Sequence, residues 1–177
     1  MPREILTEAP DGLPLTGFHG KLASTGDFVT RGLPDSFRRR WDDWITRHLA
    51  PRQRDGSTWP EGGIRFRLRS GGRVAAGVIL PGHDSAGRLF PLSLILIADR
   101  LPGPGRLDIW CDAACALPAN NTLDAEALWR ALDRLPPPAM DEALPDALPD
   151  LLLWSKFAAP LPGAPAKPDA TLAALFA

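Results

Sequence analysis

The sequence has little of the residues from which disulfide frameworks and metal centres are built, with two cysteines and three histidines in 177 residues. Cys111 and Cys115 are four residues apart and could form one bridge or half of a metal site. Two small, reduced core residues of a cytoplasmic protein are the favoured interpretation. The histidines and cysteines show no compact ligand pattern, so the sequence predicts no metal site and no cofactor.

Long apolar runs are also missing. No run reaches the roughly 18 residues that indicate a membrane-spanning helix, and the first four residues, Met-Pro-Arg-Glu, do not begin a secretory signal. We therefore expect a soluble cytoplasmic protein that does not insert into membranes.

A strong positive charge is absent as well, because the net charge is -1 and the pI is about 6.3. Nucleic-acid-binding domains usually have a pI above about 9, so no nucleic acid is expected as a partner. The alternation in residues 64–69 places three arginines on one face of a strand. That face is expected to be solvated or to dock an acidic protein.

The length and a hydrophobic content of 45% fit one domain. Residues 1–16 are expected to be a loose lead-in, 17–157 the domain, and 158–177 a flexible proline-rich tail. The pattern predicts helices at 35–49 and 123–135, a central strand at 92–98, other strands at 64–69, 74–80 and 107–110, and a helix or strand at 151–154. The fold class is therefore α/β (α+β), with a central antiparallel or mixed sheet flanked by helices.

Residues 17–34 are the most informative segment. Glycines, charged residues and bulky apolar residues alternate too irregularly for one helix or strand, which favours a shaped loop. Gly20-Lys21 is not a phosphate-binding loop, because Leu15 and Leu22 stand where that motif needs Gly and Ser or Thr. His19, Ser24 and Asp27 lie close together within one segment, and such an arrangement rarely brings the three side chains of a catalytic triad into hydrogen-bonding reach.

Two motifs together resemble the TagF (ImpM) family of type VI secretion accessory proteins. The first runs from Gly17 through Gly26-Asp27-Phe28 to Pro34, and the second spans residues 77–92. His19 and Ala23 depart from the family pattern. The resemblance implies a cytoplasmic, non-enzymatic regulator. Such proteins are described as post-translational repressors of type VI secretion that act with or through the forkhead-associated scaffold protein.

The two motifs supply the candidate partner-binding residues, with Asp27 expected to pair with Arg31, Lys21 or Arg88 and so to join the two segments. Whether these residues form a contact surface or only specify the fold stays open. Alternatives are a small hydrolase or nucleotide-handling enzyme that uses Lys21, Asp27 and Arg88, and a structural assembly factor of the secretion machine. The candidates are Gly20, Lys21, Gly26, Asp27, Phe28, Arg31, Asp84, Gly87, Arg88 and Phe90.

Overall fold

One antiparallel sheet organises the part of the chain that the computed structural model describes, residues 14–119, 123–140 and 148–177. Its strand order is β2-β1-β5-β4-β3-β6-β7, with antiparallel neighbours throughout. This arrangement confirms the predicted α+β class and the single domain. The strands are β1 Leu15–Lys21, β2 Phe28–Arg31, β3 Ile64–Ser70, β4 Arg73–Leu80, β5 Leu92–Ala98, β6 Leu151–Ser155 and β7 Ala158–Gly163.

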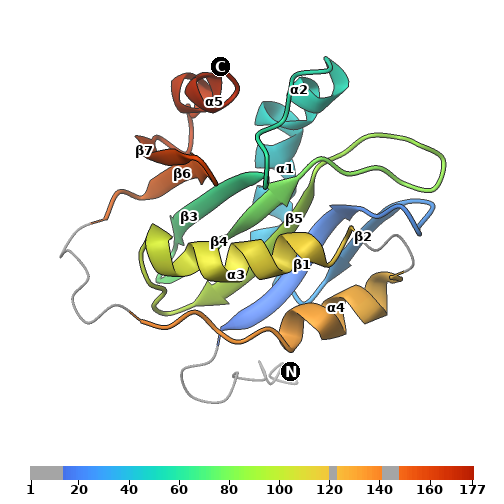
Figure 1. Cartoon of the computed structure of the whole chain (residues 1–177), viewed down its shortest axis with the longest axis horizontal. Helices are drawn as coiled ribbons and strands as arrows, with labels where there is room; N and C mark the ends of the chain where they lie inside the picture. Colours follow the sequence, from blue (N-terminus) through green and yellow to red (C-terminus); the bar gives the residue numbers. More distant parts are fainter. Residues whose placement is uncertain (1–13, 120–122, 141–147) are drawn as a thin grey trace, which may run out of the picture.

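Helices cover both faces of the sheet, as Figure 1 shows, with α3 and α4 in front and α1 behind. Two separate clusters of buried side chains result: the α3 and α4 side chains pack with one, and those of α1, α2 and α5 with the other. The helices are α1 Asp35–His48, α2 Ala50–Arg54, α3 Pro104–Ala116, α4 Ala125–Asp133 and α5 Asp169–Leu175.

The central strand and the first helix form where the sequence pattern predicts them. In β5, Leu94 belongs to the core on the α3 side and Ile95 to the core on the α1 side, because successive side chains of a strand point to opposite faces. In α1, Phe37, Trp41 and Ile45 recur at helical spacing and are buried.

Residues 17–34 are a β-hairpin leading into a turn, and not the predicted loop. The glycines suggested breaks, but Gly20 lies inside β1 because the chain passes very close to its neighbour. A Cβ atom there would lie 2.2 Å from the carbonyl oxygen of Pro91. A glycine in a strand thus marks a close approach of two backbones here.

Two further predictions are wrong. The expected strand at 107–110 lies inside α3, which begins with Pro104 in its first turn, a position where proline is favoured. The expected flexible tail at 158–177 contains β7 and α5, and Leu172 of α5 is buried in the core. Of the expected lead-in at 1–16, residues 1–13 lie outside the described part, and β1 begins at Leu15.

Two of the arginines expected to face solvent are buried, because α3 covers their side of β3. Arg65 donates hydrogen bonds to Asp108 and Asp112 of α3. Burial alone would lower the pKa of the Arg65 guanidinium, but these hydrogen bonds raise it above its ordinary value. Arg67 donates to the carbonyl oxygens of the segment before α3. Two of the three arginines therefore bind α3 or the segment before it in the same chain, and Arg69 is exposed as predicted.

Candidate binding site on two paired loops

The two motif segments meet at one end of the sheet. Residues 22–28, the turn between β1 and β2 with the first residue of β2, lie beside residues 81–91, the loop between β4 and β5 (Figure 1). We call these two segments the paired loops. The backbone N–H of Ser85 donates to the carbonyl oxygen of Thr25 at 2.7 Å. The Arg88 guanidinium donates to the carbonyl oxygen of Gly26 at 2.6 Å. The paired loops therefore form one continuous surface.

Asp84 holds this arrangement together. Its carboxylate is buried and accepts hydrogen bonds from the backbone N–H groups of Ala86 and Arg88, and from the Arg88 side chain at 2.7 Å. The Lys21 ammonium lies 3.5 Å from the same carboxylate. Burial alone would raise the pKa of the Asp84 carboxyl, but the hydrogen bonds and the Arg88 charge lower it below its ordinary value.

Asp27 does not have the joining role that the sequence analysis gave it. Its side chain is exposed, and its carboxylate accepts the backbone N–H of Phe28 at 2.7 Å. Among the described residues, Asp27 has no ion pair with Lys21, Arg31 or Arg88. The hydrolase or nucleotide-handling alternative required Lys21, Asp27 and Arg88 to converge, whereas Lys21 and Arg88 both face Asp84 instead.

An aromatic cluster supports the surface from below. Phe28 is 49% exposed, and its ring lies edge-on to the buried ring of Phe90, with centroids 4.8 Å apart. The Lys21 ammonium lies 4.8 Å from the Phe28 centroid, a cation–π contact. His19 stacks on Phe28 and is fixed by Asp42 of α1, 2.7 Å from its Nε2. Half of the Phe28 ring is thus anchored, and the other half faces solvent.

The motif glycines have different roles. Gly20 is required by packing against Pro91, as described above. Gly87 has open space around it but a φ of 80°, a left-handed conformation that glycine adopts without strain. That conformation lets its N–H donate to the Asp84 carbonyl oxygen at 3.0 Å. Gly26 has ordinary space around it and contributes its carbonyl oxygen to Arg88.

Arg31 lies apart from the paired loops. It sits at the end of β2 away from Phe28, and its side chain pairs with Glu126 of α4. The structure adds two residues that the sequence analysis did not select: Leu89, which is 45% exposed beside Arg88, and His19 under Phe28. Leu89 could have been selected from the sequence, because it is a bulky apolar residue between two candidate residues, Arg88 and Phe90.

Among the described residues, no group of three His, Cys, Asp or Glu side chains could hold a metal ion. No helix in this part of the chain is long and apolar enough to cross a membrane. Both free cysteines lie on α3. Burial raises the pKa of the Cys115 thiol, so its reactive thiolate is disfavoured at neutral pH.

These observations define a class: a single-domain α+β protein with a seven-stranded antiparallel sheet and paired loops at one end. Residues 17–135 match the family model described as TagF N-terminal domain, Type VI secretion system-associated. The chain belongs to this family, and the matched range contains both paired loops.

A solved structure with the same fold is that of PA0076 from Pseudomonas aeruginosa PAO1. It is 27% identical to this chain, with a TM-score of 0.56, and the comparison covers 90% of this chain and 76% of that one. A comparison with curated proteins finds no match.

Proposed function

We propose that the protein is a cytoplasmic, non-enzymatic regulator of type VI secretion, a post-translational repressor that binds a component of the secretion system such as the forkhead-associated scaffold protein. Membership in a type VI secretion-associated family gives the system. The observation that supports binding is the surface of the paired loops, where Phe28 and Leu89 are about half exposed and Arg88 is also exposed.

The composition of this surface is that of a protein-binding site. Protein interfaces are enriched in aromatic residues and arginine, and a few such residues contribute most of the binding energy. Arg88 is 61% exposed while Asp84 and the Gly26 carbonyl oxygen fix its guanidinium. A surface fixed before binding loses less conformational freedom when the partner arrives. Phe28 is fixed in the same way by Phe90 and Lys21.

The charges inside the site favour binding over chemistry. The Lys21 ammonium and the Arg88 guanidinium both lie against the one buried carboxylate of Asp84, so each cation already has an acidic partner within the protein. A phosphate or an acidic substrate would have to compete with Asp84 for both cations. A partner protein that packs on Phe28 and Leu89 leaves these ion pairs unchanged.

The test combines a binding assay with a secretion assay. The double variant Phe28→Ala/Leu89→Ser removes the exposed apolar groups of the paired loops. Phe157→Ala is the matched control, because Phe157 is 76% exposed in the turn between β6 and β7. We expect the double variant to lose binding to the purified forkhead-associated scaffold and to release secretion from repression in cells.

The control variant should behave as the wild type in both assays. Equal binding by the wild type and the double variant would refute the paired loops as the contact surface. Unchanged secretion after deletion of the gene would refute the regulatory role. Loss of assembled secretion machines on deletion would favour an assembly factor.

A further inference from the structure

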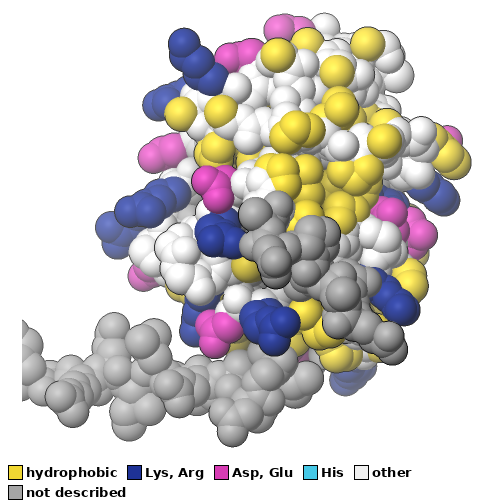
Figure 2. Space-filling model, turned by 90° about the vertical axis from the view of Figure 1, so that its left-hand side faces the viewer, with side chains coloured by type: hydrophobic (Ala, Val, Ile, Leu, Met, Phe, Trp, Pro, Cys, Tyr) yellow, Lys and Arg dark blue, Asp and Glu magenta, His cyan; other side chains and the backbone are white. Residues whose placement is uncertain are grey.

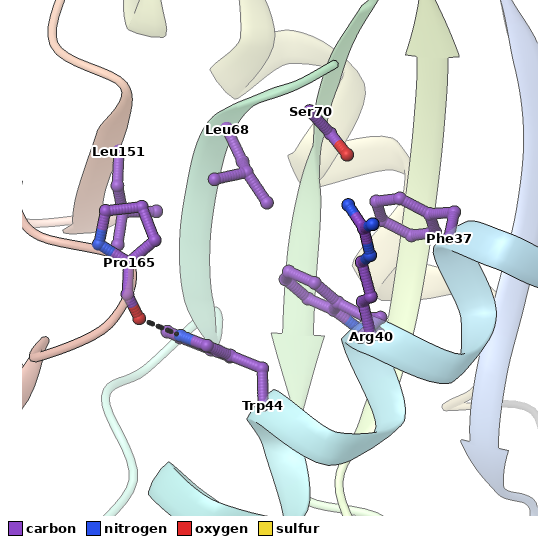
Figure 3. Close-up of a pocket in the computed structure, with 8 residues that line it drawn as sticks. Phe37, Arg40, Trp44, Leu68, Ser70, Leu151 and Pro165 are labelled. Carbon is purple, nitrogen blue, oxygen red and sulfur yellow. Dashed lines mark hydrogen bonds between the residues drawn. The ribbon is translucent and has the colours of Figure 1, made fainter.

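A second surface feature involves side chains of α1 other than Asp42, the residue that holds His19. A cavity of about 180 Å³ opens between α1, β3, β6 and the segment that joins β7 to α5. Figure 3 shows its walls, with α1 on one side and Leu151 and Pro165 on the other. The lining residues are Phe37, Arg40, Trp41, Trp44, Leu68, Ser70, Leu151 and Pro165.

The walls are apolar and held in place. The Trp41 ring stacks between Phe37 and Trp44, with centroids 5.6 and 5.4 Å away. The indole N–H of Trp44 donates to the carbonyl oxygen of Pro165 at 2.9 Å, a bond that joins the two sides of the cavity (Figure 3). The indole N–H of Trp41 donates to Ser93 on β5. These contacts fix the positions of the cavity walls.

Its size fits one side chain. A dry apolar cavity of about 150 Å³ accommodates benzene, so this volume can hold one phenylalanine or leucine side chain. Figure 2 shows hydrophobic side chains gathered over the end of the molecule that β7 and α5 form. Pro165 belongs to the segment between these elements and also lines the cavity. Pro165 therefore places one edge of the cavity at the end of the molecule that carries these apolar side chains.

The charge at the cavity is positive. Arg40 is exposed and lines the cavity, and Figure 3 shows its side chain extending from α1 on the side where Ser70 lies. Among the ion pairs and hydrogen bonds of the described residues, Arg38 of α1 faces Asp35, whereas Arg40 has no acidic partner. A guanidinium beside an apolar cavity is complementary to a carboxylate next to an apolar side chain.

We propose that this cavity binds an acidic peptide segment of a partner protein, with one phenylalanine or leucine side chain inserted and a neighbouring carboxylate on Arg40. This surface is separate from the paired loops, and the inference does not rest on the function proposed for them. A regulator with two such surfaces can hold two components at once, or one component at two points.

The experiment is a titration of the full-length ¹⁵N-labelled protein, followed by NMR of the tryptophan side chains. The probe is an acetylated pentapeptide with a central phenylalanine and two aspartates on each side. Control peptides replace the phenylalanine with alanine or the aspartates with lysines. The indole N–H signals of Trp41 and Trp44 report on the cavity. The signal of Trp129 is the internal reference, since its N–H donates to Thr16 beside α4.

The expected result is a saturable shift of the Trp41 and Trp44 signals with the acidic phenylalanine peptide and none with the alanine peptide. Arg40→Glu should weaken binding about five- to tenfold, as expected for loss and reversal of an exposed charge pair. Arg39→Glu is the matched control, because Arg39 is exposed on the same helix and does not line the cavity. It should leave binding within twofold of the wild type.

Three results would overturn the proposal. The first is no shift of either indole signal at millimolar peptide, and the second is equal binding of the lysine-flanked peptide. The third is a shift of the Trp41 and Trp44 signals with protein concentration alone, which would assign the cavity to a second copy of the chain. Variants of the paired loops should leave this titration unchanged, so the two proposals can fail separately.

Discussion

Replacing Phe28 or Phe90 by alanine distinguishes a residue that contacts the partner from one that only stabilises the paired loops. Phe90 is 6% exposed and Phe28 is 49% exposed, and their rings touch. Removing a buried phenylalanine side chain typically costs about 3–5 kcal/mol. Full burial of such a side chain contributes about 1.5–3 kcal/mol. Phe28, half of which is buried, should therefore lose only about 1 kcal/mol on replacement by alanine.

Melting temperatures make this difference visible. For a protein of this size, 1 kcal/mol corresponds to a shift of about 2–4 °C. Phe28→Ala should therefore melt about 2–4 °C below the wild type, and Phe90→Ala should melt on the order of 10 °C below it. Circular dichroism or differential scanning fluorimetry measures both.

Binding should respond in the opposite order. An aromatic residue at the centre of an interface contributes about 2 kcal/mol or more, which corresponds to roughly a 30-fold change in affinity. Phe28→Ala should lose at least this much affinity for the scaffold protein while it stays folded. The reasoning is refuted if Phe28→Ala melts as low as Phe90→Ala, or if it binds the scaffold as tightly as the wild type.

Three more predictions concern the same loops. Gly20→Ala should lower the melting temperature far more than Gly87→Ala, because its Cβ would lie 2.2 Å from the Pro91 carbonyl oxygen. Gly87 has open space, and alanine there would only have to adopt a positive φ, which costs about 1–2 kcal/mol. Equal losses in melting temperature would contradict this. Asp84→Asn should melt below the wild type at pH 7, and the difference in melting temperature should close as the pH falls below the ordinary carboxyl pKa of 3.8. The reason is that the lowered pKa of Asp84 in the folded state stabilises the protein only while the carboxylate is ionised. A difference that does not change from pH 7 to 2 would contradict this. Asp27→Ala should melt within a few degrees of the wild type, since Asp27 is exposed and bonded only to a neighbouring N–H; a collapse in melting would restore its structural role.

Regular patterns made parts of the fold predictable. The helical spacing of Phe37, Trp41 and Ile45 gave α1, and the apolar run from Leu92 gave the central strand β5. The β1–β2 hairpin was missed because Gly20 suggests a break unless the close neighbour backbone is known. A sequence does not show which backbones approach each other from distant positions.

Burial of charged groups was equally hidden. The alternation correctly placed Arg65 on the face of β3 opposite Phe66. It could not show that a helix, α3, covers that face. The strand predicted at 107–110 was wrong. Leu107, Trp110 and Ala114 are buried at helical spacing in α3, but the apolar residue Ile109 among them is exposed, which hid that spacing. The same uncertainty affected the site, where both Asp27 and Asp84 were candidates and only the folded loop shows that Asp84 is buried.

The candidate site was chosen from two motifs about 60 residues apart, and the structure places these two motifs side by side. The cavity between α1 and β6 was not predicted. Its walls come from α1, β3, β6 and the segment after β7, and no local pattern links these segments. The bond from Trp44 across the cavity to Pro165 joins residues about 120 positions apart in the sequence.

Hydrogen exchange, measured with and without the forkhead-associated scaffold protein, tests whether the paired loops form one binding surface. Backbone amides of residues 22–28 and 81–90 should exchange more slowly in the complex, both segments together and by similar factors. Amides of the turn between β6 and β7 should be unaffected. Protection of only one of the two loops, or protection confined to other parts of the chain, would contradict the proposed surface.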